Sequence, residues 1–254
     1  MSTSGDELRC CTTAGVKPEW ISSVRHTERG TVVEEEIGVA LKRARLDKKL
    51  SLRQIADQLG ISTSLLSQVE NGKTQPSVKT LFGLATVLEV SLDQIVSGRS
   101  GLDVELPQNR DAAAGIQRAA DNPVLEMENG VTWQRLATGG RTEIEPLYVT
   151  YEVGASSSVD GKQMRHDGAE FAYILEGTLR LRLDFDEHDL GPGDSFCFDS
   201  SRPHLFYNPG TVPARGVWFV FDSATHTADV KSLLDAMRTA NGSGQGRTHL
   251  PTFR

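Results

Sequence analysis

Three side chains in the second half of the chain have the types and spacing of a metal site. His166 precedes Glu170 by four positions, and His204 lies in a separate polar cluster further along the chain. Two imidazoles and a carboxylate that converge from neighbouring strands can hold a divalent metal and leave positions open for substrate and oxygen. The same three groups could instead hydrogen-bond a small molecule in a pocket.

A second candidate site consists of polar, mostly uncharged side chains in the first half of the chain. Such side chains suit the reading of base edges in the major groove of DNA. Nearby basic side chains can contact phosphates and position the protein without reading sequence. The alternative is a helical bundle that serves only protein interactions and whose polar face is exposed to water without contacting DNA. The predicted DNA-contacting residues are Arg53, Ser62, Thr63, Ser64, Ser67, Gln68, Asn71 and Lys73.

The elements that must position this polar face are two short helices joined by a glycine turn. Ser51 with Gln54 has the pattern of a capping box ahead of an apolar run. Gly60 follows at the position where a left-handed residue ends a helix, and Ser62 can cap the next helix. A helix of about eight residues, a glycine turn and a new N-cap are typical of a helix-turn-helix.

Further start and stop signals complete a helical domain over residues 34–97. The first helix begins near Val33, Asn71-Gly72 ends the third helix, and Pro76-Ser77 opens a fourth. Ser91 with Gln94 forms a second capping box. Five short helices therefore fit within about 65 residues, which suits one compact domain.

Beyond a polar linker at residues 98–122, in which 112–120 could form one helix, the hydrophobic period changes from 3.6 to 2. Residues 179–185 alternate strictly between apolar and polar, as a half-buried strand does. Many short strands with regular turns indicate an antiparallel sandwich or barrel over residues 123–222. The other predicted strands are 145–153, 171–175, 195–198 and 216–221, and the predicted turns are 186–189, 191–194 and 208–210.

The helical stretch closely resembles the Cro/lambda-repressor-like (XRE-type) helix-turn-helix family over about residues 36–95. Family members often have a phosphate-contacting Gln just after the second helix cap, where this chain has Leu52, so that contact is lost or moved, with Arg53 as the candidate. The resemblance implies a homodimer on a two-fold, double-stranded DNA operator. The matching residues are Leu50–Ala56, Gly60–Ser62, Leu66–Lys73 and Pro76-Ser77.

The second half resembles the cupin superfamily, whose fold is a double-stranded β-helix barrel, over about residues 145–222. Met164 stands where a metal-binding cupin usually has its first His, and methionine is a poor ligand for hard divalent metals. Three of the four usual ligands remain: His166, Glu170 and His204. The first motif matches at His166–Glu170 and Tyr173–Gly177, and the second at Gly191–Ser195, Ser200–His204 and Asn208–Gly210.

Two functions are compatible with these resemblances. In the first, the chain is a sequence-specific transcriptional regulator whose cupin pocket (His166, Glu170, Tyr173 and His204) senses a small-molecule effector, with or without Fe, Zn, Mn or Ni. In the second, it resembles the hydroxypropylphosphonate epoxidase family, which joins a helix-turn-helix-like domain to a cupin with a His-x3-Glu…His triad and oxidises with mononuclear non-haem iron. The intact DNA-facing pattern favours the first, so we expect no catalytic residue.

The charge distribution agrees with a DNA-binding segment. The net charge of the chain is −7, but residues 37–97 carry 8 basic and 5 acidic side chains, while residues 1–36 (4 and 7) and 98–254 (15 and 22) are acidic. A basic block between acidic ones concentrates DNA affinity on one small face. The excess of acid elsewhere is expected to weaken non-specific adhesion to DNA.

The remaining sequence features predict a cytoplasmic protein with no membrane partner. No apolar run approaches the ~18 residues of a spanning helix, and the first residues lack the apolar stretch of a secretory signal. Three cysteines fit neither a disulfide framework nor a zinc motif, and Cys197 is expected in the core. Residues 1–33 are expected to be disordered, and 223–254 to hold one amphipathic helix (228–239) and a flexible tail. His26, His188, His226 and His249 are expected to be solvated.

Overall fold

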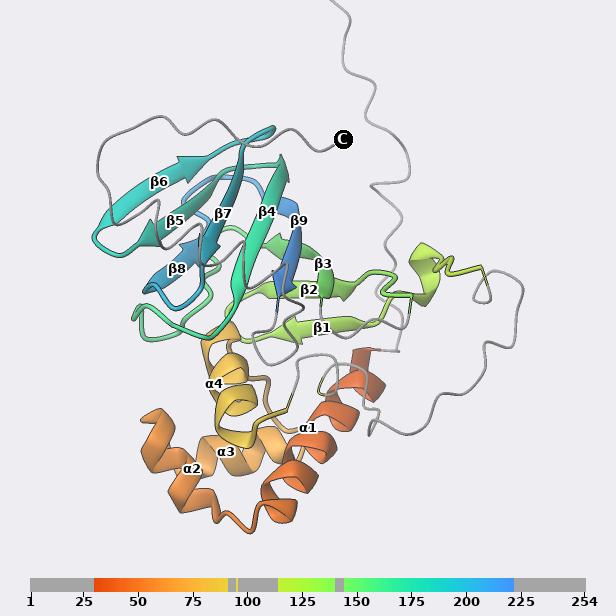
Figure 1. Cartoon of the computed structure of the whole chain (residues 1–254), viewed down its shortest axis with the longest axis vertical. Helices are drawn as coiled ribbons and strands as arrows, with labels where there is room; N and C mark the ends of the chain where they lie inside the picture. The colour runs from red at the N-terminus through yellow and green to blue at the C-terminus, as the bar shows by residue number, and fades with distance from the viewer. Residues whose placement is uncertain (1–29, 91–94, 96–113, 140–143, 222–254) are drawn as a thin grey trace, which may run out of the picture.

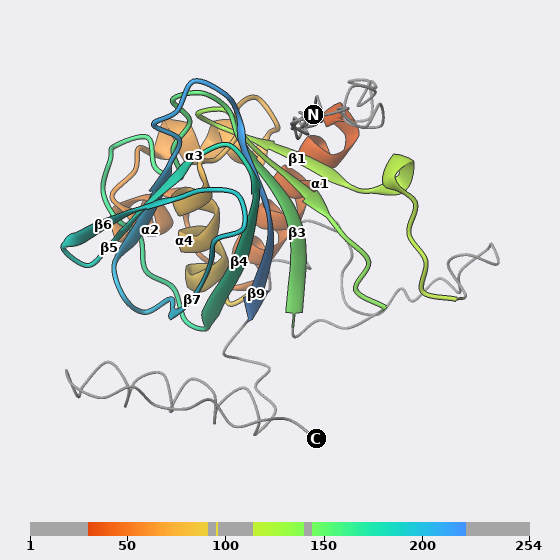
Figure 2. The same ribbon diagram turned by 90° about the horizontal axis from the view of Figure 1, so that it is seen from above.

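The fold was obtained as a computed structural model that describes residues 30–90, 95, 114–139 and 144–221. The C-terminal helix, the fifth helix apart from the helical residue Ile95, and most of the predicted N-terminal disorder lie outside these residues. Residues 30–33, predicted to be disordered, instead form the first turn of a helix. Helices come first and strands second, and Figures 1 and 2 show the strands stacked against the helices with α4 directed at them. No helix in the described ranges has the length and apolar character needed to cross a membrane.

Four helices, α1 (Gly30–Asp47), α2 (Leu52–Leu59), α3 (Thr63–Glu70) and α4 (Val78–Leu88), make up the described part of the first domain. The predicted caps of α2, α3 and α4 are confirmed, whereas α1 begins at Gly30 and not near Val33. The Ser51 hydroxyl accepts the Gln54 N–H while the Gln54 amide oxygen accepts the Ser51 N–H. Gly60 is left-handed with φ +66°, and Ser62 and Ser77 cap α3 and α4.

The described helices pack around an apolar core, with a buried ion pair beside it. Apolar side chains of all four helices are almost fully buried, among them Leu41, Ile55, Leu66 and Leu84. Arg45 of α1 lies beside this core and donates two hydrogen bonds to the Glu70 carboxylate at the end of α3 (2.6 and 2.8 Å), and a third to the Leu50 carbonyl (3.0 Å). The pair therefore ties both ends of the helix-turn-helix to α1.

The described strands form two antiparallel sheets that face each other, as expected for the cupin barrel. The six-stranded sheet has the order β1-β2-β3-β9-β4-β7 and the three-stranded sheet the order β6-β5-β8. The last strand, β9, pairs with both β3 and β4 and so joins the two halves of the larger sheet. The strands are β1 (Val124–Met127), β2 (Val131–Arg135), β3 (Ile144–Tyr151), β4 (Ala169–Glu176), β5 (Leu179–Leu183), β6 (Asp186–Leu190), β7 (Ser195–Asp199), β8 (His204–Tyr207) and β9 (Ala214–Phe221).

Several details of the strand prediction were wrong. Residues 186–189, predicted as a turn, form β6; its side chains are exposed, so burial imposes no apolar alternation, and charged pairs across the hairpin such as Arg182–Glu187 stabilise it instead. The turn is formed instead by Asp184 (φ +56°) and the fully exposed Phe185, which were predicted to be the last two residues of the preceding strand. The short strands β1, β2 and β8 were not predicted. In the described part of 112–120 only a 3-10 turn at Ala119–Asp121 is present, not an α-helix.

Cys197 was predicted to be a core residue, and this was also wrong: it is exposed. Side chains alternate along β7, and Phe196 and Phe198 point inward, where their rings contact Phe206. The residue between them must point outward. His188, predicted to be solvated, is exposed as expected, although it lies in a strand.

The buried apolar residues of the helices and of the strands form one continuous cluster. Two helices make the connection: Val78 and Phe82 of α4 are buried against strand-domain residues, and α1 packs against β1. Backbone hydrogen bonds also cross between the two parts, from the Lys79 N–H to the Ser157 carbonyl (3.0 Å) and from the Glu128 N–H to the Pro76 carbonyl (3.1 Å). The two domains are therefore packed together rather than simply tethered.

Candidate functional site

Helix α3 presents a polar face on a buried apolar support. The side chains of Thr63, Ser64 and Gln68 are exposed and make no hydrogen bond to another described residue, whereas Leu66 and Val69 on the opposite side are buried. Helices α2 and α3 pack on each other, and Ala56 of α2 is fully buried. The helix-turn-helix therefore leaves side chains suited to base-edge readout free at the surface.

The other predicted DNA-contacting residues are partly occupied by local interactions. The Ser62 hydroxyl accepts the Leu65 N–H as the helix cap, and the Asn71 amide donates to the Ser67 carbonyl at 2.6 Å. Arg53 lies 3.6 Å from Asp57 in an exposed pair, which is weak and leaves the guanidinium available. Lys73 is exposed just beyond α3, and Ser67 is half-buried.

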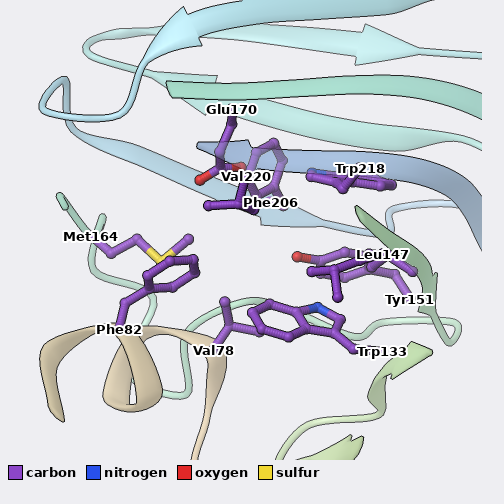
Figure 3. A pocket seen from close by; sticks show the side chains of 11 residues that line it. Val78, Phe82, Trp133, Leu147, Tyr151, Met164, Glu170, Phe206, Trp218 and Val220 are labelled. Atoms are coloured by element: carbon purple, nitrogen blue, oxygen red, sulfur yellow. The ribbon is translucent and has the colours of Figure 1, made fainter. Parts of the chain in front are cut away.

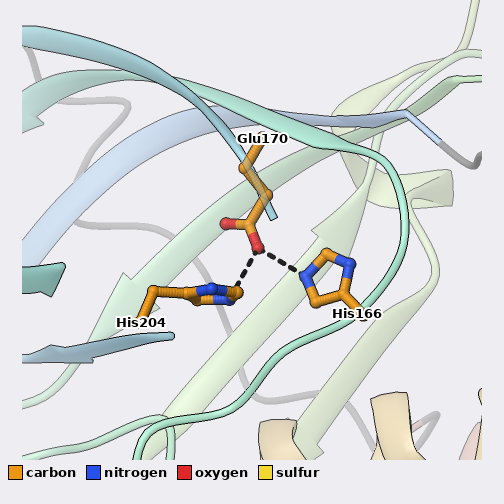
Figure 4. A group of neighbouring side chains, drawn as sticks. All are labelled: His166, Glu170 and His204. Carbon is orange, nitrogen blue, oxygen red and sulfur yellow. Dashed lines mark hydrogen bonds and ion pairs between the residues drawn. The ribbon is translucent and has the colours of Figure 1, made fainter. Parts of the chain in front are cut away.

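The three candidate metal ligands converge between the two sheets, as Figure 4 shows. Glu170 lies on β4 of the larger sheet and His204 on β8 of the smaller one, while His166 precedes β4. One carboxylate oxygen, Glu170 Oε1, lies 2.7 Å from His166 Nε2 and 3.2 Å from His204 Nε2. All three residues are buried, and their ligand atoms lie within 4.8 Å of one another.

Backbone carbonyls orient both imidazoles toward the carboxylate. His166 Nδ1 donates to the Asp167 carbonyl at 3.1 Å, and His204 Nδ1 donates to the Arg202 carbonyl at 2.8 Å. A carbonyl can only accept, so Nδ1 carries a proton on each ring and Nε2 points into the cluster. This is the arrangement in which metal-binding histidines are usually held.

The buried Glu170 carboxylate is ionised, so the cluster requires a compensating positive charge. Burial acts to raise the pKa of Glu170, but the neighbouring His204 and His166 outweigh it and hold that pKa at about 2. Burial acts to lower the pKa of His204, but attraction to the Glu170 carboxylate outweighs it and the pKa is raised. His204 Nε2 is buried without a hydrogen bond of good geometry. Either ring protons or a metal ion can supply the missing charge.

The donor set fits a divalent metal. Imidazole nitrogen and carboxylate oxygen both bind Zn²⁺ at ~2.0–2.2 Å, and ligands bonded at that distance lie roughly 3 Å from one another. The separations from Glu170 Oε1 to the two Nε2 atoms are close to that value. Met164, which stands at the usual fourth-ligand position of the motif, is buried, hydrogen-bonds through its backbone to His204 and lines the same cavity as Glu170.

A small apolar cavity adjoins the cluster (Figure 3). Its free volume is about 10 Å³, close to the minimum for one water molecule. Glu170 supplies the carboxylate at its wall, and the rest of the lining is aromatic or aliphatic. The lining residues are Val78, Phe82, Trp133, Leu147, Val149, Tyr151, Met164, Glu170, Phe206, Trp218 and Val220.

Tyr173 was predicted to line this pocket, and that was wrong. It follows Glu170 by three positions on β4, so alternation places it on the opposite, outer face, where it is 44% exposed. Phe82 was missed because it lies in the other domain, about 80 positions before His166 in the chain. Trp133 was missed with its strand, although an apolar alternation over Val131–Trp133 was a signal that could have identified it.

Two family models match the two domains. A helix-turn-helix model matches residues 41–95, and a cupin domain model matches residues 147–220. Both matches lie where the structure has the α2–α3 unit and the two facing sheets.

Several curated proteins are similar to this chain over part of its length. The HTH-type transcriptional regulator PuuR of Escherichia coli is 27% identical over 173 residues, which cover 67% of this chain and 86% of PuuR. The HTH-type transcriptional regulator RghRB of Bacillus subtilis is 32% identical over 122 residues, which cover 43% of this chain and 84% of RghRB.

A solved structure supports the architecture. An HTH_3 family transcriptional regulator from Vibrio cholerae aligns with a TM-score of 0.53 and 21% identity, over 76% of this chain and 98% of its own. At that identity the likeness concerns the fold. Together with the sequence matches, it shows that this chain belongs to the XRE-type (HTH_3) helix-turn-helix transcriptional regulators that carry a C-terminal cupin domain.

Proposed function

We propose that this regulator binds a specific double-stranded DNA operator as a cytoplasmic homodimer and that its cupin domain senses a small-molecule effector. The observation that carries the first part is the capped, buried support of α3 beneath an exposed row of uncharged hydrogen-bonding side chains. Rigid placement of such a row is what direct readout of bases requires.

Each predicted contact has a role in this proposal. Thr63, Ser64, Ser67 and Gln68 meet base edges in the major groove. Arg53 and Lys73 contact phosphates. Ser62 and Asn71 mainly stabilise the ends of α3, because the side chains of these two residues already hydrogen-bond to the backbone of that helix. Phosphate contacts position the domain and base contacts specify the sequence.

Replacing both Ser64 and Gln68 by alanine should lower operator affinity at least tenfold and reduce sequence preference, since a good base-edge contact is worth about 1–3 kcal/mol. The operator can be selected from random DNA, and affinities measured by gel shift at fixed salt. Gln58→Ala, on the exposed face of α2, is the matched control and should change little. Unchanged affinity and preference in the double variant would reject α3 as the reading helix.

We further propose that His166, Glu170 and His204 hold a divalent metal, with Fe, Zn, Mn and Ni as candidates. A bound metal would supply a Lewis acid at the wall of the cavity. The Asp167 and Arg202 carbonyls orient the two imidazoles, and burial of all three residues excludes water from the site. Metal analysis of the purified protein tests this: about one equivalent per chain supports it, and none after reconstitution rejects it. Oxygen consumption by the metal-loaded protein with phosphonates would instead favour the oxidoreductase.

A further inference from the structure

Helix α4 of the DNA-binding domain inserts two side chains into the cupin pocket. Val78 and Phe82 are 2% and 6% exposed, and both line the cavity beside Glu170 and Met164 (Figure 3). The Phe82 ring stacks on the His166 ring, with centroids 3.9 Å apart and planes 6° from parallel. It also meets the Trp133 ring edge-on at 5.9 Å. Phe82 is therefore held by the same imidazole that belongs to the candidate metal site.

Polar contacts around these two side chains fix α4 on the cupin. The Lys79 N–H, at the start of α4, has no acceptor within its own helix, and the cupin carbonyl of Ser157 accepts it. The Lys79 ammonium lies 3.0 Å from each carboxylate oxygen of Asp160. The Glu128 N–H donates in the other direction, to the Pro76 carbonyl. Two backbone amides thus report directly whether α4 is seated.

The seated helix leaves no room for a ligand. Small-molecule pockets usually measure ~300–1,000 Å³, whereas the free volume beside the cluster is about 10 Å³. The lining is nevertheless that of a ligand site, with aromatic walls and one carboxylate. The Phe82 ring forms part of this lining and stacks on His166.

We propose that Phe82 acts as an internal ligand of the cupin pocket, and that the effector is a molecule with a flat apolar group and one polar end that replaces it. The polar end would meet Glu170 and His204 or their metal, and the flat group would stack on His166. The effector and the seated α4 are then mutually exclusive. This inference rests on the proposed role of the pocket as an effector site, and it names the ligand class and the regulation.

Displacement of α4 would move the reading helix. Helix α4 packs against α1 and α2, and both of these pack against α3, so a shift of α4 is passed to α3 through packed helices. Releasing Phe82 therefore changes the placement of α3 relative to the cupin. A ligand that binds only the unseated arrangement shifts the population toward it, which is the requirement for allosteric control.

Hydrogen exchange at the amides of Lys79 and Glu128 tests the inference without DNA. In Phe82→Ala, the protection of both should fall at least tenfold, because the ring and its stack on His166 are lost. Val87→Ala, which truncates a partly buried residue on the same helix outside the cavity, should leave both amides protected. Phe82→Leu keeps most of the apolar volume, so its amide protection should lie between that of wild type and that of Phe82→Ala. This variant tests the inference if the alanine variant does not fold.

Phenol, an apolar ring with one polar atom, is the probe for the ligand class. It should bind Phe82→Ala at least tenfold more tightly than wild type, because apolar cavities of ring size take up benzene-like molecules and the wild type must first expel its own ring. In the wild type, phenol should lower the protection of the two amides.

Equal phenol affinity in the two proteins, no binding to Phe82→Ala, or unchanged protection would each overturn the inference. None of these outcomes involves DNA, so the proposed reading helix would stand or fall separately by the operator measurement.

Discussion

Replacing Glu70 by alanine should destabilise the helical domain by about 3–5 kcal/mol, a large share of the ~5–15 kcal/mol that holds a typical domain folded. The cost arises because Arg45, 8% exposed, would keep its charge while losing both carboxylate acceptors. Urea unfolding followed by far-UV circular dichroism reports the helices. Tryptophan fluorescence in a Trp20→Phe background reports the other domain, because the described helices contain no Trp and Trp133 and Trp218 lie on strands.

Removing both partners is the matched control. Arg45→Met with Glu70→Leu replaces the ion pair by apolar side chains of similar size, and such replacements are often neutral or stabilising. We expect the double variant to recover most of the stability lost in Glu70→Ala. Glu70→Gln, which keeps one acceptor, should be intermediate and remains measurable if the alanine variant is unfolded. A loss below about 1 kcal/mol in Glu70→Ala would show that the pair contributes little.

Glu170→Gln should lower divalent metal affinity by more than about 100-fold. Loss of an outer-shell partner alone typically costs 10–100-fold, and this change removes a ligand and its negative charge from between two imidazoles. Metal content and calorimetric titration with Zn²⁺ measure the effect. Because both Nε2 atoms must be unprotonated to bind, uptake by the wild type should release protons.

Glu176→Gln is the control for this substitution. Glu176 lies on the same strand but at its exposed end, where its carboxylate pairs with Arg215. The same loss of one charge there should leave metal affinity within about twofold, as expected for a surface pair. Equal affinity of Glu170→Gln and wild type would place any bound metal outside the His-Glu-His cluster.

Much of the helical domain could be predicted because its signals are local. Ser51, Gly60, Ser62 and Ser77 act through hydrogen bonds and backbone angles within a few residues, so their identity and spacing suffice to place the helix ends. The buried pair of Arg45 and Glu70 could not be predicted in this way, because the partners are 25 residues apart and each resembles an ordinary surface charge.

The strand domain was harder to predict because its pattern depends on which side is buried. The core strands were found where alternation is strong, as in Leu179–Leu183, but β6 is polar on both sides and was taken for a turn. Cys197 and Tyr173 were placed on the wrong face, since a shift of one residue exchanges inside and outside.

The sequence by itself determined two domains, a capped helix with a polar face, and three residues of the right types to bind a metal. Only the tertiary structure decided that these three meet within 4.8 Å and that Phe82 from the other domain stacks on one of them. The physical reason is that caps and periods act over a few residues. Contacts between a helix and a distant pocket depend instead on how two finished domains pack, and no local pattern encodes that.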